Sequence, residues 1–157
     1  MKTFRVSASG YVDAAASKVY LVIADYRRHH PHIVPPEYFE GVDVLEGGVG
    51  AGTRTRVRMS VLGKKRAFEQ VVTEPEPGRV LMETNTDGSA VSTFTVEDAG
   101  HDESYVTIAT ELPRQAGLPG LVERMAVRLL FPRIYNKEIA RLAEYVHRLP
   151  SDTSYLR

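Results

Sequence analysis

The histidines that lie closest together in the sequence are the first candidates for chemistry. His29, His30 and His32 fall in a segment that also contains Pro35 and Pro36. A metal ion needs three or four converging ligands, and neighbouring residues of a stiff proline segment cannot all point to one place. The spacing therefore predicts no metal site. It indicates a solvated loop, or a loop from which His29 or His32 donates a hydrogen bond to a ligand oxygen.

The second candidate is a glycine-rich run, Gly47-Gly48-Val49-Gly50-Ala51-Gly52. A phosphate-binding loop must be followed by a helix whose first N–H groups face the anion. Here the following residues alternate as in a strand, and the run lacks the Gly-Lys-Ser/Thr of a nucleotide-binding loop. The run therefore predicts a tight turn between strands, with glycines at positive φ angles.

The sequence does not identify a catalytic acid or base. The chain has no cysteine, so a thiolate nucleophile or thiolate metal ligand is ruled out. Glu83 and Glu111 fall in expected strands, but sequence does not show whether they converge. We assign no catalytic residue. An enzyme on this scaffold would first be tested at Tyr26, His29, His32 and Glu83.

Composition narrows the class of protein. The 157 residues carry no net charge with histidine neutral, whereas nucleic-acid binders usually carry a basic surplus. The N-terminus has no apolar signal-peptide core, and no apolar run approaches the ~20 residues of a membrane span. We expect a single domain over residues 1–157 in the cytoplasm, with no nucleic-acid partner and no integral membrane association.

Three arginines alternate along one expected strand. Arg54, Arg56 and Arg58 point one way, which predicts a solvated outer face paired with Glu69 of the next strand. A surface for an anionic partner is the alternative. The opposite, inner face of this strand is expected to carry Thr53, Thr55, Val57, Met59 and Val61.

The last long segment, from about Pro119 to Leu149, reads as one amphipathic helix. Pro132 should kink or split it. Arg128 and Asn136 lie at or beside the apolar stripe. Arg128 could extend its side chain along the stripe to water, and Asn136 could hydrogen-bond backbone groups freed by Pro132. Alternatively, one or both could point into a cavity and bind the polar end of a ligand. The apolar side is expected to hold Leu118, Leu121, Val122, Met125, Leu129, Ile139, Leu142, Ala143 and Val146, and the polar side Glu123, Lys137, Glu138, Arg141, Glu144 and Arg148.

The remaining elements precede this helix. Asp13 is a candidate N-cap for a short helix over residues 14–24, and residues 25–30 fit a further short helical turn. Residues 74–78 read as a turn. The expected strands cover residues 4–12, 38–46, 53–62, 65–73, 79–85, 90–97 and 104–112. Short connections between the last six strands favour an antiparallel sheet.

This order of elements, with its residues, resembles the START-like (SRPBCC) superfamily of polyketide cyclase/dehydrase-like and lipid-transport proteins, over nearly the whole chain. The resemblance rests on the Val12–Tyr20 strand-to-helix step, Asp25-Tyr26 before a proline loop, the glycine run and Glu74-Pro75-Glu76-Pro77-Gly78-Arg79. It implies the α+β helix-grip fold, a curved antiparallel sheet of about seven strands (β-αα-β6-α) wrapped round a long C-terminal helix. It also implies a hydrophobic cavity between the two, with the glycine run as a flexible lip at its mouth.

The favoured hypothesis is a small protein that binds a hydrophobic or amphipathic molecule, such as a lipid, quinone or polyketide, in that cavity. The alternatives are a cyclase/dehydratase-type enzyme on the same scaffold, and a protein-interaction module whose cavity has collapsed. No cofactor is expected, and the long helix and the edge strands could each support a homodimer. The candidate ligand-binding residues are Tyr26, His32, Val57, Met59, Phe68, Phe94, Ile108, Met125, Arg128 and Leu129.

Overall fold

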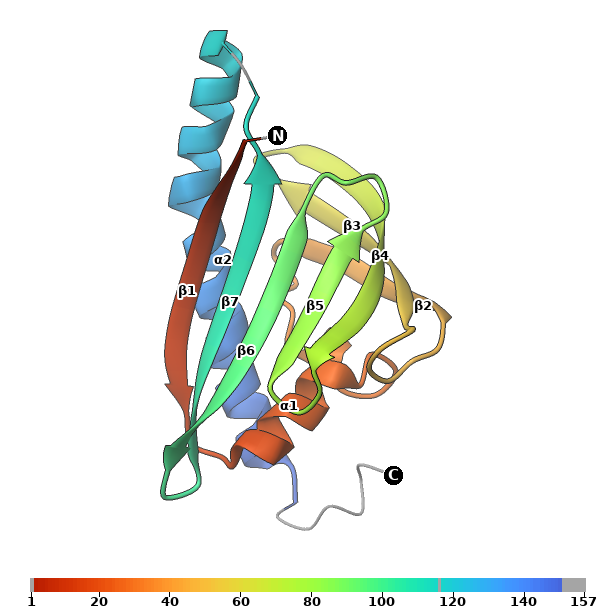
Figure 1. The fold of residues 1–157 in the computed structure, drawn as a ribbon, viewed down its shortest axis with the longest axis vertical. Helices are drawn as coiled ribbons and strands as arrows, with labels where there is room; N and C mark the ends of the chain where they lie inside the picture. Colours follow the sequence, from red (N-terminus) through yellow and green to blue (C-terminus); the bar gives the residue numbers. More distant parts are fainter. Residues whose placement is uncertain (1, 116, 151–157) are drawn as a thin grey trace.

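The computed structural model describes residues 2–115 and 117–150, and it confirms the helix-grip α+β fold. One antiparallel sheet has the strand order β1-β7-β6-β5-β4-β3-β2 and curves around a long C-terminal helix (Figure 1). The elements are β1 (Thr3–Val12), α1 (Ala16–Ala24), the 3₁₀ turn η1 (His30–His32), β2 (Phe39–Glu46), β3 (Arg54–Val61), β4 (Lys64–Glu76), β5 (Val80–Asn85), β6 (Val91–Gly100), β7 (Glu103–Pro113) and α2 (Gly117–Arg148).

Three local expectations differ from the structure. Asp13 does not cap α1, because the helix begins later and its N-cap is Ala15, which makes no side-chain hydrogen bond. β4 continues through residues 74–76, where a turn was expected, and a register shift after Thr73 lets the strand pass Pro75. Pro132 lies inside α2 and does not split it in two, since the helix is continuous from Gly117 to Arg148.

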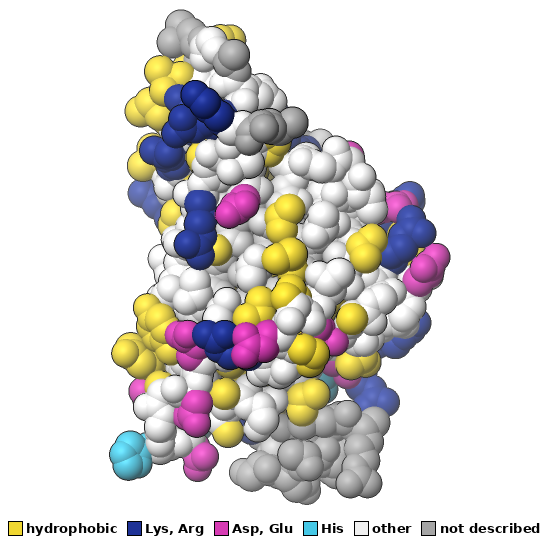
Figure 2. Space-filling model, in the orientation of Figure 1, with side chains coloured by type: hydrophobic (Ala, Val, Ile, Leu, Met, Phe, Trp, Pro, Cys, Tyr) yellow, Lys and Arg dark blue, Asp and Glu magenta, His cyan; other side chains and the backbone are white. Residues whose placement is uncertain are grey.

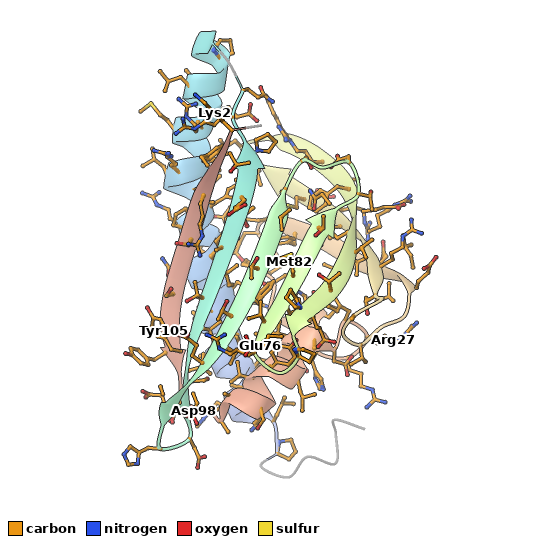
Figure 3. All side chains as sticks on the ribbon, viewed as in Figure 1. Lys2, Arg27, Glu76, Met82, Asp98 and Tyr105 are labelled. Carbon is orange, nitrogen blue, oxygen red and sulfur yellow. The ribbon has the colours of Figure 1, made fainter. Side chains whose placement is uncertain are left out.

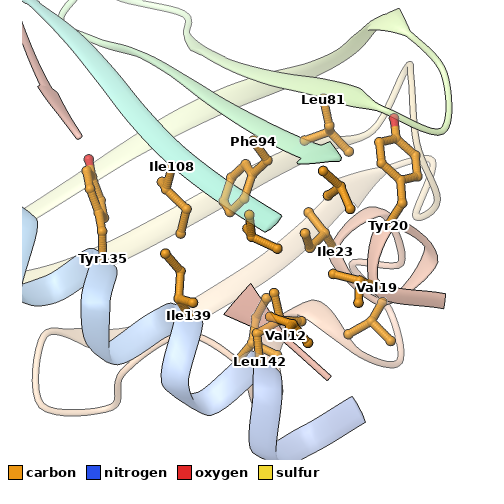
Figure 4. Packing of buried hydrophobic residues seen from close by; sticks show 14 of the residues in the cluster. Val12, Val19, Tyr20, Ile23, Leu81, Phe94, Ile108, Tyr135, Ile139 and Leu142 are labelled. Atoms are coloured by element: carbon orange, nitrogen blue, oxygen red, sulfur yellow. The ribbon is translucent and has the colours of Figure 1, made fainter. Parts of the chain in front are cut away.

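The hydrophobic core fills the end of the molecule where α1 crosses beneath the sheet. Leu81, Phe94 and Ile108 lie side by side on three neighbouring strands, with Leu81 toward α1 and Ile108 toward Ile139 of α2 (Figure 4). Ile139 and Leu142 of α2 pack against them, and both are almost completely buried. This packing fixes the second half of α2 on the sheet.

The outer face of the sheet is polar, as the arginine alternation predicted. Arg54 and Arg56 both donate to Glu69, at 2.6 and 3.0 Å. A similar group lies further along the sheet, where Arg79 bridges Glu76 and Glu97. Figure 2 shows this second group as a band of charged side chains across the lower sheet, and Figure 3 labels Glu76 within it.

The first half of α2 begins with turns that project beyond the strand ends (Figure 1). Several of its apolar side chains are exposed, with Met125 at 57% and Leu129 at 67%. Leu121 and Val122 are exposed on the same half of the helix. Figure 2 shows hydrophobic and basic side chains together along these turns. The stripe read from the sequence is therefore buried only in the second half of the helix.

One helix residue was assigned to the wrong side. Glu138 was expected on the polar face of α2, but it is buried and only 3% exposed. The reason is helical geometry: Glu138 lies four residues from both Ile134 and Leu142, so it shares the buried face with them.

Candidate functional site

Polar side chains replace apolar ones partway along the inner face of the sheet. Strand pairing places Glu83 opposite Ser92, and Ser92 opposite Thr110, one row beyond the apolar row of the core. In the following row Asn85 lies opposite Gln70, and Gln70 opposite Thr55. All of these except Ser92 are buried, and Ser92 is half-buried. We call these six residues the polar layer.

Two side chains from the segment after α1 reach the polar layer at Glu83. The hydroxyl of Tyr26 donates to Glu83 Oε1 at 2.6 Å. The ring of Tyr26 stacks on that of His30, with centroids 4.3 Å apart. His30 Nδ1 lies 2.7 Å from the carbonyl oxygen of Ile23 and donates to it, which leaves Nε2 as an acceptor 3.8 Å from Glu83 Oε1.

Burial sets the protonation of both rings. It raises the pKa of the Tyr26 phenol well above its ordinary value, and the charge of Glu83 adds to that rise. Burial lowers the pKa of His30, and this outweighs the opposing effects of Glu83 and of the hydrogen bond to Ile23. Tyr26 is therefore a neutral donor and His30 a neutral imidazole at pH 7.

A second carboxyl faces this group from α2. Glu138 makes no hydrogen bond or ion pair with any residue the structure describes. Burial raises its pKa well above the ordinary value, and the nearby charge of Glu83 raises it further. Together, Tyr26, His30, Glu83 and Glu138 form what we call the carboxyl cluster. It places Glu138 where burial and the like charge of Glu83 favour holding a proton.

The rest of the polar layer is partly satisfied. Tyr135 of α2 contacts the hydroxyl of Thr110, which in turn lies 2.8 Å from that of Ser92. Gln70 donates to Asn85 at 3.2 Å. Thr55 Oγ1, by contrast, is buried with no hydrogen-bond partner among the described residues. Buried polar atoms are nearly always paired, so Thr55 and Glu138 are unusual for a closed core.

The glycine run positions the cluster from outside. The backbone N–H of Tyr26 donates to Gly48 O, and that of Gly50 donates to Ala24 O. Gly47, Gly48, Gly50 and Gly52 all have positive φ angles, as the sequence predicted. The run is thus tied to the end of α1 by backbone hydrogen bonds, and these bonds fix where Tyr26 enters the interior.

A cleft opens between the first half of α2 and the sheet. It has a volume of about 120 Å³, and it is lined in part by Phe4, Leu112 and Val127. Phe4 and Leu112 form the inner-face row next to Val6 and Thr110, so the cleft borders the polar layer. An ion pair of 3.7 Å between Arg66 of β4 and Glu123 of α2 spans it.

The predicted ligand-binding residues fall into two groups. Tyr26, Val57, Phe94 and Ile108 are buried, and Met59 and Phe68 are partly buried, all facing the interior. Strand pairing places Val57 opposite Phe68, one row beyond Thr55 and Gln70, and Phe94 opposite Ile108 in the core. The exposed group comprises His32, Met125, Arg128 and Leu129.

Three polar side chains that were expected to contact a ligand, Arg128, Asn136 and His32, either contact other residues or are exposed to solvent. Arg128 lies over the ring of Phe4, 5.7 Å from its centroid, and Asn136 is exposed. His32 stacks on Tyr145, whose hydroxyl lies 2.7 Å from Nδ1 of the buried His29. Within residues 2–115 and 117–150, no three His, Asp or Glu side chains are arranged to hold a metal.

Sequence reasoning gave His30 no role of its own beside its neighbours and missed Glu138 altogether. The signal for Glu138 was present, because Ile134, Glu138 and Leu142 recur every four residues. No comparable signal marked His30, whose position depends on the 3₁₀ turn and on the carbonyl of Ile23.

The curved sheet, the long helix and the polar interior define a START-like protein. Residues 3–147 match the family described as polyketide cyclase/dehydrase and lipid transport, and the chain belongs to that family. Family and fold place it among ligand-binding or cyclase-like proteins. No helix among the described residues is long and apolar enough to cross a membrane.

Solved structures support the same fold. The KanY protein (ms6282) is 26% identical, with a TM-score of 0.81 over 94% of this chain and 99% of that one. The Zhui aromatase/cyclase of Streptomyces sp. R1128 is 16% identical, with a TM-score of 0.77 over 94% and 95%. A START superfamily protein of Mycobacterium smegmatis is 17% identical, with a TM-score of 0.70 over 93% and 99%. No curated protein sequence matches the chain.

Proposed function

We propose that this protein binds an amphipathic small molecule between the sheet and α2, with the polar end of the molecule at the carboxyl cluster. The observation that carries the proposal is Glu138, a buried carboxyl with no partner among the described residues, facing a second buried carboxyl. An unpaired buried carboxyl costs several kcal/mol, and packing gives no reason to keep one. Such groups occur mainly where a ligand or a reaction needs them.

Apolar residues beside the polar layer suit the rest of such a molecule. Val57, Met59 and Phe68 lie on the same inner face, beyond Thr55 and Gln70. Burying apolar ligand surface against them contributes about 25 cal/mol per Å² before the costs of binding are subtracted. The cleft beside Phe4 and Leu112 would be the route of entry.

Native mass spectrometry of the protein purified from its own host tests this proposal. We expect a co-purifying small molecule, lost when Met59 or Phe68 is replaced by aspartate in a variant that still folds. The matched control is Met82→Asp, because Met82 lies on the outer face of β5 (Figure 3). A single bound protein at fixed stoichiometry, with no small molecule, would instead favour the interaction-module alternative.

A second candidate function is acid–base catalysis on the bound molecule, of the cyclase/dehydratase type. Burial and the nearby charge of Glu83 raise the pKa of Glu138, which favours a carboxyl able to donate a proton to the bound molecule. Dehydration of a β-hydroxy ketone, followed by ultraviolet absorbance, tests this candidate. We expect Glu138→Gln to slow turnover by about 10²-fold or more. An unchanged rate constant would remove Glu138 from any such reaction.

A further inference from the structure

The carboxyl cluster has more hydrogen-bond acceptors than donors. The Tyr26 hydroxyl is already committed to Glu83 Oε1. Glu83 Oε2, the oxygens of Glu138 and the neutral Nε2 of His30 are all left without a hydrogen bond from the described residues. One proton held by the carboxyl pair satisfies only one of these acceptors.

No buried cationic side chain in the part of the chain that the structure describes balances these acceptors. The buried polar residues that the structure describes include no lysine and no arginine. Arg141, one turn further along α2, directs its guanidinium to the carbonyl oxygen of His32. The groups close enough to interact electrostatically with Glu138 are Glu83 from β5, Tyr26 from the segment after α1, and Tyr135 from α2 itself. His30 lies beside Glu83. None of them is a cation at pH 7.

These two observations identify a class of ligand, and the inference rests on the binding function proposed above. We propose that the polar end of the ligand is a protonated amine, held by Glu83 and Glu138. An ammonium group offers three donors and one positive charge, which is what this cluster lacks. A carboxylate ligand offers no donor and brings a like charge, so fatty acids are disfavoured.

An ammonium ion would take the place of the proton that the carboxyl pair holds in the free protein. Binding should therefore release a proton, and the affinity for an amine should rise with pH until Glu138 is ionised in the free protein. An uncharged ligand of the same size should show neither effect. This linkage separates recognition of charge from simple burial of an apolar chain.

Three probes with the same chain and different polar ends test the proposal: octylamine, octan-1-ol and octanoate. In calorimetry at pH 6 and pH 8 we expect octylamine to bind at least tenfold more tightly than octan-1-ol, and octanoate to bind most weakly. Repeating the octylamine titration in buffers of different ionisation enthalpy should show proton release at pH 6.

Variants of the intact chain locate the effect. Glu138→Gln, which keeps the shape of the side chain, should weaken octylamine binding tenfold or more and change octan-1-ol binding by less than threefold. Glu144→Gln, on the exposed side of the same helix, is the matched control and should change neither. Thermal unfolding of each variant checks that it is folded. The comparison of the three probes on the wild-type protein tests the amine assignment even if a variant fails to fold.

The outcomes distinguish the two proposals. If octan-1-ol binds and octylamine binds no better, or if Glu138→Gln binds octylamine as well as the wild type, the amine assignment is wrong and the binding function stands. If octanoate binds most tightly, the assignment is also wrong. If none of the three probes binds, both the amine assignment and the proposed interior site fail.

Discussion

Glu138 is the residue at which stability and function separate most clearly. It occupies a buried position between Ile134 and Leu142, where an apolar side chain would pack without losing a hydrogen bond. Replacing buried charged groups by apolar ones of similar volume is often stabilising. The persistence of a carboxyl here is therefore better explained by binding than by folding.

Glu138→Leu should consequently raise the free energy of unfolding, by about 1–3 kcal/mol. Urea denaturation at pH 7 measures this change. Glu144→Leu serves as the control, since an exposed position on the same helix should shift stability by no more than about 0.5 kcal/mol. A large loss of stability in Glu138→Leu would show that the carboxyl has a structural role.

The same residue makes stability depend on pH in a defined direction. Its pKa is raised in the folded protein, chiefly by burial and further by Glu83. The folded state therefore holds the proton more tightly than the unfolded state, so this contribution is fully present below pH 4.5 and is lost as pH rises through the folded-state pKa. Between pH 5 and 8, Glu138→Gln should lose less stability than the wild type in urea titrations. Parallel curves for the two proteins would contradict the assignment.

His30 acts in the opposite direction. Its pKa is lowered by burial, so its contribution to stability is present above pH 6.5 and is lost as pH falls through the folded-state pKa. His30→Gln should flatten the loss of stability on acidification from pH 7 to 5, measured by thermal unfolding. If acidification destabilises this variant as much as the wild type, another group is responsible.

At the scale of elements, the glycine run shows why a turn that looks flexible is held in place. Glu74 accepts hydrogen bonds from the Tyr20 hydroxyl at 2.7 Å and from the Ala51 N–H at 3.0 Å. A Cβ atom at Gly50 would lie 2.6 Å from Glu74 Oε2, so a methyl group would have to displace this carboxylate. The run, α1 and β4 are therefore one hydrogen-bonded unit.

Two alanine substitutions separate backbone strain from this contact. Gly50 and Gly63 both have positive φ angles, but only Gly50 has a neighbour in the way of a side chain. Gly63→Ala should cost about 1 kcal/mol through strain alone. Gly50→Ala should cost about 2–3 kcal/mol, since it also disrupts two hydrogen bonds. Chemical denaturation compares them, and equal losses would show that Glu74 adjusts freely.

The elements also show where sequence reasoning succeeded and where it failed. Alternation placed Arg54 and Arg56 outside and Val57 inside, because a strand has only two faces. A helix has no such sharp division, so Glu138 was assigned to solvent although it lies on the buried face with Ile134 and Leu142. Met125 and Leu129 were expected to line the interior, yet both are largely exposed, and Val127, Leu130 and Phe131 of the same helix pack against the core instead.

On the scale of the whole molecule, the order of elements was sufficient to predict the helix-grip fold. Hairpin-length connections dictated the order of β2 to β7. The site was less predictable. The carboxyl cluster joins residues separated by more than 100 positions, from Tyr26 to Glu138, and only the closed fold brings them together.

The two halves of α2 should differ in local stability. The second half carries Ile139 and Leu142 into the core, whereas Leu121 to Leu129 includes several exposed apolar side chains. In hydrogen-exchange mass spectrometry of the dilute protein, residues 117–129 should exchange faster than residues 134–146. If residues 117–129 were instead as well protected from exchange as residues 134–146, and lost this protection on dilution, a homodimer would cover the first half of α2.

The strand order also determines how this protein resists aggregation. Because the sheet does not close on itself, β2 forms one of its edges, a place where another chain could add by backbone pairing. Register shifts lie near both ends of this strand, and Glu40, Asp43 and Glu46 extend acidic side chains along it. Irregular pairing and charged side chains both discourage the growth of an intermolecular sheet. The β2 edge is thus protected against the fibril formation that an open sheet invites.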